Sequence, residues 1–375
     1  MKKIAFITTN GWMPWGGSEE LWSQTALRMA GEGFVVGVSV AKWDIKEHPM
    51  IRQLEAAGCV VQRRVKRRNI FQRAVNKFSK NKYPYDWLDK FKPDLTVISQ
   101  GSIIGDVGWK RACILRRIPY VCILQCVSEL HWPLNSDFLD SLREEYISAD
   151  RVFFVSNKNR EVLFKILGTE LPNSSIVRNP FKVSYYANIV YPPIDGGIRL
   201  AMVASLNCLH KGHDMIFEIL RKDKWRKRQI KVILYGDGPH RKLLESLKKA
   251  WSLENIYFEG YSTDIEDIWK KNHALLLGSR LEDLPIALVE AMLCGRIPVV
   301  TDVGGNKELV EDNVNGFLAK APTVELIDEA MERAWQRKDE WEEMGKLAAE
   351  KARKLIPADP VKIFSDQLKE LLSCR

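Results

Sequence analysis

Two acids, Glu282 and Glu290, are separated by seven residues in a segment that also carries a strand pattern and a helix pattern. Residues 275–277 form a short apolar run, as expected for a parallel strand buried on both faces. Pro285 suits the first turn of the following helix, because its missing N–H would have no partner there, and Gly295 suits the end of that helix. Glu282 is therefore expected in the loop at the carboxyl end of the strand. Glu290 is expected inside the helix, roughly 7.5 Å along its axis from Pro285 at ~1.5 Å per residue.

This spacing is suited to a particular kind of ligand. Open parallel sheets bind ligands beyond the carboxyl ends of their strands, and the first N–H groups of a helix attract phosphate. A carboxylate before the phosphate seat and another behind it would hold hydroxyl groups on opposite sides of a diphosphate. One set of hydroxyl groups would belong to a sugar and the other to a ribose, as in a nucleotide sugar. The ordinary alternative makes Glu282 a solvated loop acid and Glu290 the polar side of an amphipathic helix.

The elements that position these residues follow an alternating pattern of strands and helices. Residues 3–9 form the first expected strand, and a loop ending in Gly16 and Gly17 leads into a helix from about Ser18. Glu19 and Glu20 are expected to interact with the positive end of that helix. Strand, glycine loop, helix and strand make a Rossmann-type opening, although G-x-G-x-x-G is absent. Further strands are expected at residues 34–40, 93–100, 119–125, 149–156, 175–177, 199–204, 231–235, 256–260 and 297–301.

The composition is that of an ordinary globular protein of two domains. The chain has 375 residues, of which 46% are hydrophobic and 28% are charged, and this length is large for one core. Residues 185–197 contain two prolines and two glycines and form the best candidate linker, so the boundary is expected near residue 190. No apolar run approaches the ~20 residues of a membrane span, and the N-terminus lacks the pattern of a signal peptide. Seven cysteines without paired or metal-type spacing fit a reducing cytoplasm.

The net charge of +9 is concentrated in residues 63–92. Such a basic run is most often a solvated face. It would also attract anionic lipid headgroups, with about 1 kcal/mol for each basic residue near a charged surface. This makes peripheral contact with the inner membrane face an alternative to a purely cytoplasmic location. Nucleic acid is not expected as a partner, because the run has neither a recognition motif nor interleaved aromatic residues.

Residues 275–319 resemble the retaining glycosyltransferases of the GT-B fold, family 4. The E-x7-E loop, the run EAMLCGRIPVVTDVGG and the later NGFLA carry this resemblance, which extends over both halves of the chain and is strongest from residue 203 onward. It implies two doubly wound α/β domains of Rossmann type facing each other across a cleft. The expected acceptor-side domain covers residues 1–190 and the nucleotide-sugar domain residues 191–355. The C-terminal helix, residues 356–375, is expected to cross back to the first domain.

The resemblance also implies roles for individual residues. Glu282 would contact the transferred sugar, Glu290 the ribose hydroxyls and Lys211 the leaving diphosphate, for which a compact ammonium charge is suited. Three further groups are donor-binding candidates. Gly16 and Gly17 are expected to close over the diphosphate, and Tyr261 either stacks on the nucleobase or merely covers the core edge. The acidic loop contributes Arg280, Leu284 and Pro285. Lys211 has an ordinary alternative as a surface turn lysine.

Two positions depart from the family pattern. Asp283 replaces a glycine, which removes a residue able to adopt positive φ beside the sugar site. Ser205 replaces an arginine, which removes one positive charge from the expected pyrophosphate site. Arg280 and His210 are the candidates to compensate for that charge.

A second group of candidates belongs to the first domain. His131 lies in an expected strand-end loop, where an imidazole is able to assist proton movement or to serve only as a structural hydrogen-bonding residue. Glu129, in the same loop, is a further acceptor-side candidate. Trp12 and Trp15 flank the glycine loop and either stack on an acceptor sugar or anchor the loop by packing.

The expected reaction is transfer of a hexose-type sugar from a nucleoside diphosphate to a hydroxyl acceptor, with retention at the anomeric carbon as the resemblance implies. The acceptor classes are glycans, lipid-linked saccharides and small molecules, with cell-surface polysaccharide synthesis as the expected setting. No metal or other cofactor is expected, since there is no Asp-x-Asp and fixed positive groups would stabilise the diphosphate. The alternatives are a nucleotide-sugar-binding protein with impaired catalysis and a GT-B nucleotide-sugar epimerase.

Overall fold

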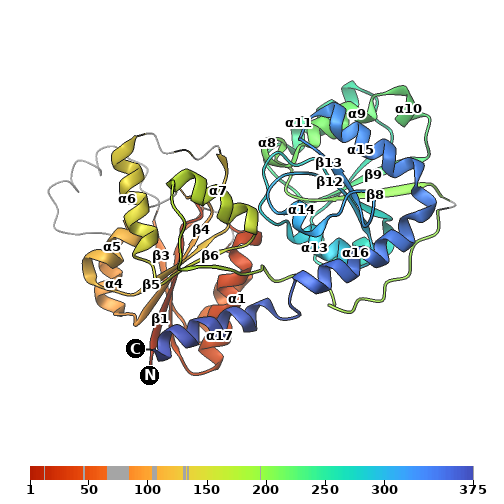
Figure 1. The fold of residues 1–375 in the computed structure, drawn as a ribbon. Coiled ribbons are helices and arrows are strands. Elements are labelled where there is room, and N and C mark those ends of the chain that lie inside the picture. The colour runs from red at the N-terminus through yellow and green to blue at the C-terminus, as the bar shows by residue number, and fades with distance from the viewer. Residues whose placement is uncertain are drawn as a thin grey trace. The chain divides into compact units, whose positions relative to one another are not determined.

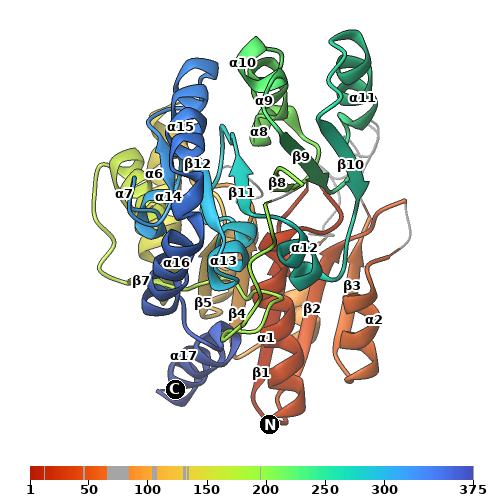
Figure 2. The same cartoon turned by 90° about the vertical axis from the view of Figure 1, so that its right-hand side faces the viewer.

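Two parallel sheets organise the chain in the computed structural model, which describes residues 1–11, 13–44, 47–65, 84–103, 108–129, 132, 135–194 and 196–374. Helices cover both faces of each sheet (Figures 1 and 2). The chain divides into a first unit, residues 1–180 and 359–375, and a second unit, residues 181–358. The expected fold of two doubly wound α/β domains is confirmed.

The sheet of the first unit has seven parallel strands in the order β3-β2-β1-β4-β5-β6-β7. The strand order reverses between β1 and β4, which are neighbours in register Ile4↔Leu95. The strands are β1 Lys3–Thr8, β2 Val35–Ala41, β3 Val60–Arg64, β4 Leu95–Gln100, β5 Tyr120–Leu124, β6 Arg151–Phe154 and β7 Ser174–Ile176. The helices are η1 Gly17–Glu19, α1 Glu20–Gly31, α2 Pro49–Ala56, α4 Asp86–Phe91, α5 Gly108–Arg116, α6 Ser136–Ile147, α7 Asn157–Leu167 and α17 Pro360–Ser373.

The sheet of the second unit has six parallel strands in the order β10-β9-β8-β11-β12-β13. Its reversal point lies between β8 and β11, where Leu200 is paired with Ala274. The strands are β8 Ile198–Val203, β9 Ile230–Tyr235, β10 Ile256–Gly260, β11 Ala274–Leu277, β12 Ile297–Thr301 and β13 Phe317–Ala319. The helices are α8 Cys208–Lys211, α9 His213–Leu220, α10 Asp223–Arg226, α11 Arg241–Ala250, α12 Ile265–Lys271, α13 Ile286–Leu293, α14 Asn306–Leu309, α15 Val324–Gln336, η3 Lys338–Glu340 and α16 Trp341–Leu355.

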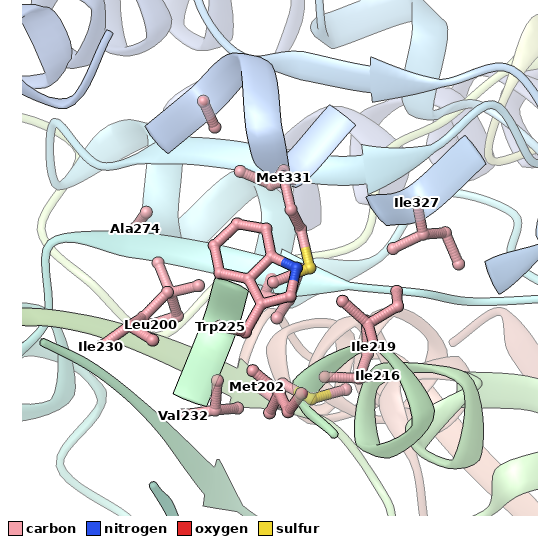
Figure 3. Close-up of a cluster of buried hydrophobic side chains, with 14 of the residues drawn as sticks. Leu200, Met202, Ile216, Ile219, Trp225, Ile230, Val232, Ala274, Ile327 and Met331 are labelled. Carbon is pink, nitrogen blue, oxygen red and sulfur yellow. The ribbon is translucent and has the colours of Figure 1, made fainter. Parts of the chain in front are cut away.

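Each sheet is covered by an apolar cluster on both faces, which explains why its central strands read as continuous hydrophobic runs. Along β8, Leu200 and Met202 belong to one cluster while Ala201 belongs to the other, as alternation along a strand requires. The first of these clusters is built around the buried indole of Trp225, with Met331 beside it (Figure 3). The strand ends are therefore held by a packed core on each side.

The C-terminal helix α17 belongs to the first unit and packs against α1, as both views show (Figures 1 and 2). Arg28 on α1 forms an ion pair of 2.7 Å with Asp359, which is also the N-cap of α17. Phe364 packs edge to face on Phe153 of β6, with ring centroids 5.1 Å apart. The return of the terminal helix to the first domain is thereby confirmed.

The beginning and the end of the second unit are bound to each other. The hydroxyl of Tyr185 lies 2.8 Å from the carbonyl oxygen of Arg353 and 2.9 Å from that of Ile356. Arg353 in turn donates from Nε to the carbonyl oxygen of Tyr185, at 3.0 Å. The segment that enters this unit therefore lies beside the segment that leaves it.

Candidate functional site in the second unit

The candidate site lies at the reversal point of the second sheet, where ligands bind in open α/β folds. Lys211 follows β8 and ends the short helix α8, and Glu282 follows β11. Because β8 and β11 are adjacent and parallel, their carboxyl ends bring these two loops to the same edge of the sheet. Two residues that are 71 positions apart in the chain thus meet by topology.

Lys211 and Glu282 form an ion pair in which Nζ lies 2.6 Å from Oε1. Ser279 donates its hydroxyl to the same oxygen, at 2.7 Å. The side chain of Glu282 is 7% exposed and that of Lys211 is 23% exposed. Two donors on one carboxylate oxygen fix the orientation of the group, while the other oxygen keeps the capacity to accept further hydrogen bonds.

The loop of Glu282 is held from behind by the end of β12. Thr301 donates its hydroxyl to the carbonyl oxygen of Ser279, at 2.7 Å. Gly304 has φ +58°, and a Cβ there would lie 2.1 Å from the carbonyl oxygen of Glu282. Gly305 donates its N–H to the carbonyl oxygen of Asp283. The two glycines of the TDVGG run therefore let the backbone after β12 lie in direct contact with the backbone of the acidic loop.

Asp283 does not impose the constraint that its replacement of glycine implied. Among the described residues, the non-glycine positions with positive φ are Lys92, Arg117, Ser252 and Asn313, and Asp283 is not one of them. The loop therefore accepts a residue with a Cβ at position 283 without left-handed backbone. The replacement of glycine by Asp283 therefore causes no backbone strain at this position.

The loop of Lys211 packs directly against the acidic loop. Gly212 has φ +65°, and a Cβ there would lie 1.9 Å from the carbonyl oxygen of Gly278, so only glycine fits. The carbonyl oxygen of His210 accepts the backbone N–H of Arg280, at 2.7 Å. The ammonium group thus reaches Glu282 from a backbone that is itself fixed to the same segment.

Arg280 and His210 do not offer the extra charge expected of them. Arg280 forms two short contacts to Asp214, at 2.8 and 2.7 Å, and donates to the carbonyl oxygen of Cys208, at 2.7 Å. The bonds to Asp214 raise the pKa of Arg280, so this guanidinium is a charged clamp between the two loops. Burial and then the charge of Lys211 lower the pKa of His210, so its imidazole is neutral at pH 7. In the described structure, the charge of Arg280 is thus paired with Asp214, and His210 carries no charge at pH 7.

Glu290 lies within α13 and is 3% exposed. Its Oε1 accepts the backbone N–H of Lys182, at 2.9 Å, in the segment that enters the second unit. Glu266 on α12 accepts the N–H of Ser184 in the same way, at 2.7 Å. Glu290 is therefore a buried acid that binds the segment leading into the second unit, and the alternative that places it on the polar side of the helix is wrong.

The N-terminus of α13 keeps the features of a phosphate seat. Pro285 is its N-cap, no described side chain caps the helix, and its first turn contains no acid. The first N–H groups of a helix point out of its end, where they are open to a ligand. Leu284 is buried beneath this turn with 7% exposure. The seat lies between Glu282, before it in the chain, and Glu290, after it.

Tyr261 follows β10 and is 73% exposed. Since β9 lies between β10 and β8, the ring is two strands away from Lys211 in the sheet. Its exposure excludes the alternative in which it covers the core. The ring is available for stacking, at the outer strand of the sheet.

The candidates of the first unit are arranged separately. Gly16 has extended backbone, with φ −163°, and a Cβ there would meet only the flexible end of Met13, 2.7 Å away. Gly17 begins the short helix η1. Trp15 stacks on His48 with centroids 4.0 Å apart, which makes it a packing residue of the loop.

Other candidates from the sequence lie at the margin of the described structure or beyond it. Glu129 is exposed, and Trp12 and His131 lie outside the described residues. In the basic run, Arg63 is held by Glu47 and Glu55 at 2.7 Å each, and Arg64 is buried and donates to Ser39. These two arginines serve the fold, while residues 66–83 lie outside the described part of the chain.

Within the described ranges, no group of three or more His, Cys, Asp or Glu side chains is arranged to hold a metal ion. No described helix is long and apolar enough to cross a bilayer. All seven cysteines are free thiols. Glu19, which the sequence assigned only to the positive end of a helix, is a buried acid with 3% exposure.

Residues 194–353 match the family model "Glycosyl transferases group 1". Curated relatives include the Bacillus anthracis N-acetyl-α-D-glucosaminyl L-malate synthase, 30% identical over 128 residues that cover 34% of this chain and 32% of the relative. A Pseudomonas syringae glycogen synthase is 35% identical over 160 residues, covering 42% of this chain and 33% of the relative. The chain thus matches about a third of the length of these relatives.

Among solved structures, Anabaena Alr3699/HepE in complex with UDP-glucose has a TM-score of 0.73 with 20% identity, and the match covers 100% of both chains. Staphylococcus aureus TarM, solved with UDP, Fondaparinux and α-GlcNAc-glycerol, has a TM-score of 0.71 with 12% identity, covering 99% of this chain and 100% of TarM. At these identities the likeness establishes the fold, which is GT-B. The match of residues 194–353 relates the second unit to group 1 glycosyltransferases.

Proposed function

We propose that this protein transfers a hexose-type sugar from a nucleoside diphosphate to a hydroxyl acceptor, with retention of anomeric configuration. The observation that carries the proposal is the contact between Lys211 and Glu282 at the reversal point of the second sheet, next to the uncapped N-terminus of α13. Glu290 follows that terminus at the spacing expected for a ribose on the far side of a diphosphate. The match of residues 194–353 to group 1 glycosyltransferases supports the same assignment.

Each group has a distinct role in the proposed reaction. The bond between the anomeric carbon and the diphosphate oxygen breaks, and its electron pair stays on the diphosphate. Lys211 and the first N–H groups of α13 stabilise that developing charge in positions fixed by the fold. Glu282 accepts a hydroxyl of the transferred sugar, and Glu290 accepts a hydroxyl of the ribose. The acceptor oxygen forms the new bond to the anomeric carbon, and its proton passes to the leaving diphosphate.

The donor side is tested first with a thermal-shift screen of nucleoside diphosphates and their sugars on the purified protein. UDP and UDP-sugars head the screen, because solved structures of similar fold contain UDP or UDP-glucose. A donor that stabilises the protein is then incubated with and without acceptors, and the products are identified by mass spectrometry. The proposal requires a glycosylated acceptor whose anomeric configuration by NMR equals that of the donor.

The other outcomes of this experiment identify the alternative functions. Donor binding without transfer or hydrolysis across the acceptor screen would identify a nucleotide-sugar-binding protein. A changed sugar nucleotide in the absence of any acceptor would identify an epimerase. We propose further that no metal is needed, because fixed positive groups face the diphosphate. Loss of transfer in EDTA and its recovery with manganese would overturn that part.

Charge and cysteine usage support a proposal for the acceptor and the location. We propose a glycan or lipid-linked acceptor and a cytoplasmic location, in keeping with seven free thiols. Because Arg63 and Arg64 are engaged inside the first unit, any contact with an anionic membrane is assigned to the remaining basic residues up to residue 92. Sedimentation with vesicles should then increase with their content of acidic lipid. Equal sedimentation with neutral and acidic vesicles would exclude this contact.

A further inference from the structure

Glu19 is an acid buried in the first unit, at the carboxyl end of β1, and only 3% of its surface is exposed. Its Oε1 accepts from the hydroxyls of Thr8 and Ser18, both at 3.1 Å, and from the amide of Asn10, at 3.4 Å. Its Oε2 accepts from the indole N–H of Trp22, at 2.9 Å. Both carboxylate oxygens are thus occupied by neutral donors from the protein.

The helix dipole alone does not explain this side chain. Glu19 is the N-cap residue of α1 by position, but it forms no side-chain cap hydrogen bond to the helix. Its carboxylate instead turns toward the strand and the loop, where Thr8 ends β1 and Asn10 follows it. The sequence-based assignment of Glu19 to the positive end of the helix therefore leaves out its principal contacts.

Two of the four donors, Asn10 and Ser18, lie at the two ends of the turn that contains Gly16 and Gly17. Asn10 lies before this turn and Ser18 lies after it, and the backbone N–H of Glu19 also donates to the carbonyl oxygen of Gly16, at 3.0 Å. Trp22 connects the same carboxylate to the core of the first unit. One buried group consequently fixes where the glycine turn begins and where it ends.

The cluster around Glu19 lies next to the reversal point of the first sheet. Thr8 ends β1, whose neighbour β4 lies across the reversal point of the first sheet. The backbone N–H of Thr9 donates to the carbonyl oxygen of Ser99 on β4, at 2.8 Å, and a Cβ on Gly101 would lie 3.9 Å from the side chain of Asn10. Ligand crevices in open α/β sheets occur at such reversal points.

Burial is costly for this group, which indicates a specific reason for its presence. Desolvation raises the pKa of Glu19, and the hydrogen bonds from Thr8, Trp22, Ser18 and Asn10 act in the opposite direction. Removing one partner of such a network leaves the other polar groups unsatisfied in a region of low dielectric constant. An apolar residue would fill the space at lower cost, but of the side-chain contacts described here between the ends of the turn it would leave the amide of Asn10 on the hydroxyl of Ser18, at 3.5 Å.

We infer that Glu19 is a positioning residue, which holds the Gly16–Gly17 turn in the conformation that the proposed transfer reaction requires. This inference rests on the proposed function, together with the role that the family resemblance implies for Gly16 and Gly17, where small residues would let the backbone approach the donor diphosphate. Glu19 itself contacts no substrate. It acts by fixing Asn10 and Ser18, so its loss frees the turn while β1 and α1 remain in place.

The test compares Glu19→Ala, Glu19→Gln and the control Thr25→Val. Thr25 is buried in the same helix and donates its hydroxyl to the carbonyl oxygen of Leu21, at 2.7 Å, so the control loses a buried hydrogen bond of α1 away from the turn. Backbone amide exchange over residues 13–18 is measured in each protein, because local opening of a segment accelerates its exchange. The steady-state constants kcat and KM for the donor are measured in parallel.

Glu19→Ala should accelerate exchange over residues 13–18 by about tenfold or more, as expected for loss of roughly 1.4 kcal/mol of local stability. Glu19→Gln retains one acceptor oxygen and should be intermediate, and it keeps the test decisive if the alanine variant folds poorly. The kcat/KM value should fall in the same order, and Thr25→Val should match wild type in both measurements. Exchange in both Glu19 variants no faster than in Thr25→Val would overturn the inference.

The two readouts separate this inference from the proposed function. If wild-type protein transfers no sugar to any acceptor, the proposed function fails, and amide exchange still decides whether Glu19 holds the turn. If wild type is active and a mobile turn in Glu19→Ala leaves kcat/KM unchanged, the positioning role in transfer is rejected while the transfer function stands. Accelerated exchange together with reduced kcat/KM supports both.

Discussion

Lys211 Nζ and Glu282 Oε1 lie 2.6 Å apart, although the two residues come from loops that follow different strands. The same carboxylate oxygen receives the hydroxyl of Ser279, and each loop is held by a glycine that no larger residue can replace. The contact is thus a property of the backbone of the second unit as well as of the two side chains. It gives the proposed reaction a fixed positive group, the ammonium of Lys211, and a fixed hydrogen-bond acceptor, the carboxylate of Glu282.

Replacement of Lys211 by alanine should lower kcat by about 10²-fold or more, the scale found when one preorganised charge partner of a transition state is removed. The variant also leaves Glu282 with Ser279 as its remaining donor among the described side chains, so some loss of donor affinity should accompany the loss of rate. Steady-state kinetics with the identified donor measure both. Lys227→Ala, an exposed lysine of the same unit, is the control. Near-normal turnover in Lys211→Ala would refute the role of this ammonium group.

Ser279→Ala should reduce kcat/KM for the donor by about tenfold, because a hydrogen bond to a charged group contributes roughly 1.5 kcal/mol. Ser279 donates its hydroxyl to Glu282, and removal of this hydroxyl lets the carboxylate rotate about its contact with Lys211. Ser279→Thr keeps the hydroxyl and should restore most of the activity. If the threonine variant is as impaired as the alanine variant while both are equally stable, packing at position 279 rather than the hydrogen bond is responsible.

Arg280→Ala and Asp214→Ala should impair donor binding to a similar degree, because the structure makes these two residues one clamp between the loops. The double variant should then be no worse than either single variant, as expected for residues that act through a shared contact. Isothermal titration with the nucleoside diphosphate measures all three. If Arg280 contacts the diphosphate directly, Asp214→Ala would instead free its charge and leave affinity unchanged or increased.

Glu290→Ala should weaken the binding of free nucleoside diphosphate by about tenfold or more, as expected when a buried charged hydrogen-bond partner is lost. This acid also accepts the N–H of Lys182, so an effect through the segment that enters the second unit must be separated from an effect on the ribose. Glu266→Ala is the matched control, since Glu266 holds the N–H of Ser184 two residues later. Equal losses of affinity in the two variants would assign the effect to the segment that enters the second unit, which contains Lys182 and Ser184.

His213 should make the second unit sensitive to acid. The residue is fully buried, both of its ring nitrogens lack a hydrogen-bond partner within the described part of the chain, and burial lowers its pKa to about 4. Its pKa in the unfolded chain is about 6.5, so the unfolded chain takes up a proton as the pH falls from 6.5 to 4 while the folded protein does not. Folding stability should therefore decrease across this window, by roughly 3 kcal/mol at most.

The variant His213→Leu isolates this contribution. It should raise the thermal midpoint at pH 7, because it removes buried nitrogens that no described group satisfies, at a typical cost of about 1–3 kcal/mol. The difference in midpoint between variant and wild type should grow as the pH is lowered from 6.5 to 4. A difference that is constant across this range would show that His213 does not titrate in the way proposed.

The alternation of strands and helices was sufficient to predict the doubly wound fold, because buried parallel strands are read directly from apolar runs such as residues 275–277. The spacing of Glu282 and Glu290 predicted their placement before and within α13. What the sequence did not reveal was which polar groups pair with each other. Arg280 was a candidate for the diphosphate site, and in the structure it binds Asp214 on α9, a contact between segments distant in sequence that no local pattern reports.

Glu19 shows the same limit in the first unit. An acid at the start of a helix is usually explained by the helix dipole, and nothing in the local pattern indicates that its side chain turns back toward Thr8 and Asn10. The linker is a related case. The prolines and glycines of residues 185–197 placed the domain boundary near residue 190, whereas the compact units divide after residue 180. The intervening backbone is held by Glu266 and Glu290, contacts that composition does not report.

The contact of Tyr185 with Ile356 has a consequence for the architecture of the gene product. Tyr185 and Ile356 lie near the two ends of the second unit and contact each other. Residues 181–358 therefore form an insert with neighbouring ends, and the chain of the first unit continues after it with α17. Inserts of this geometry are the kind that tolerate excision, transplantation and circular permutation. Under the proposed function, residues 181–358 are the donor-binding half, and this half is suited to exchange between related chains. Such an exchange would combine the sugar preference of one chain with the acceptor preference of another.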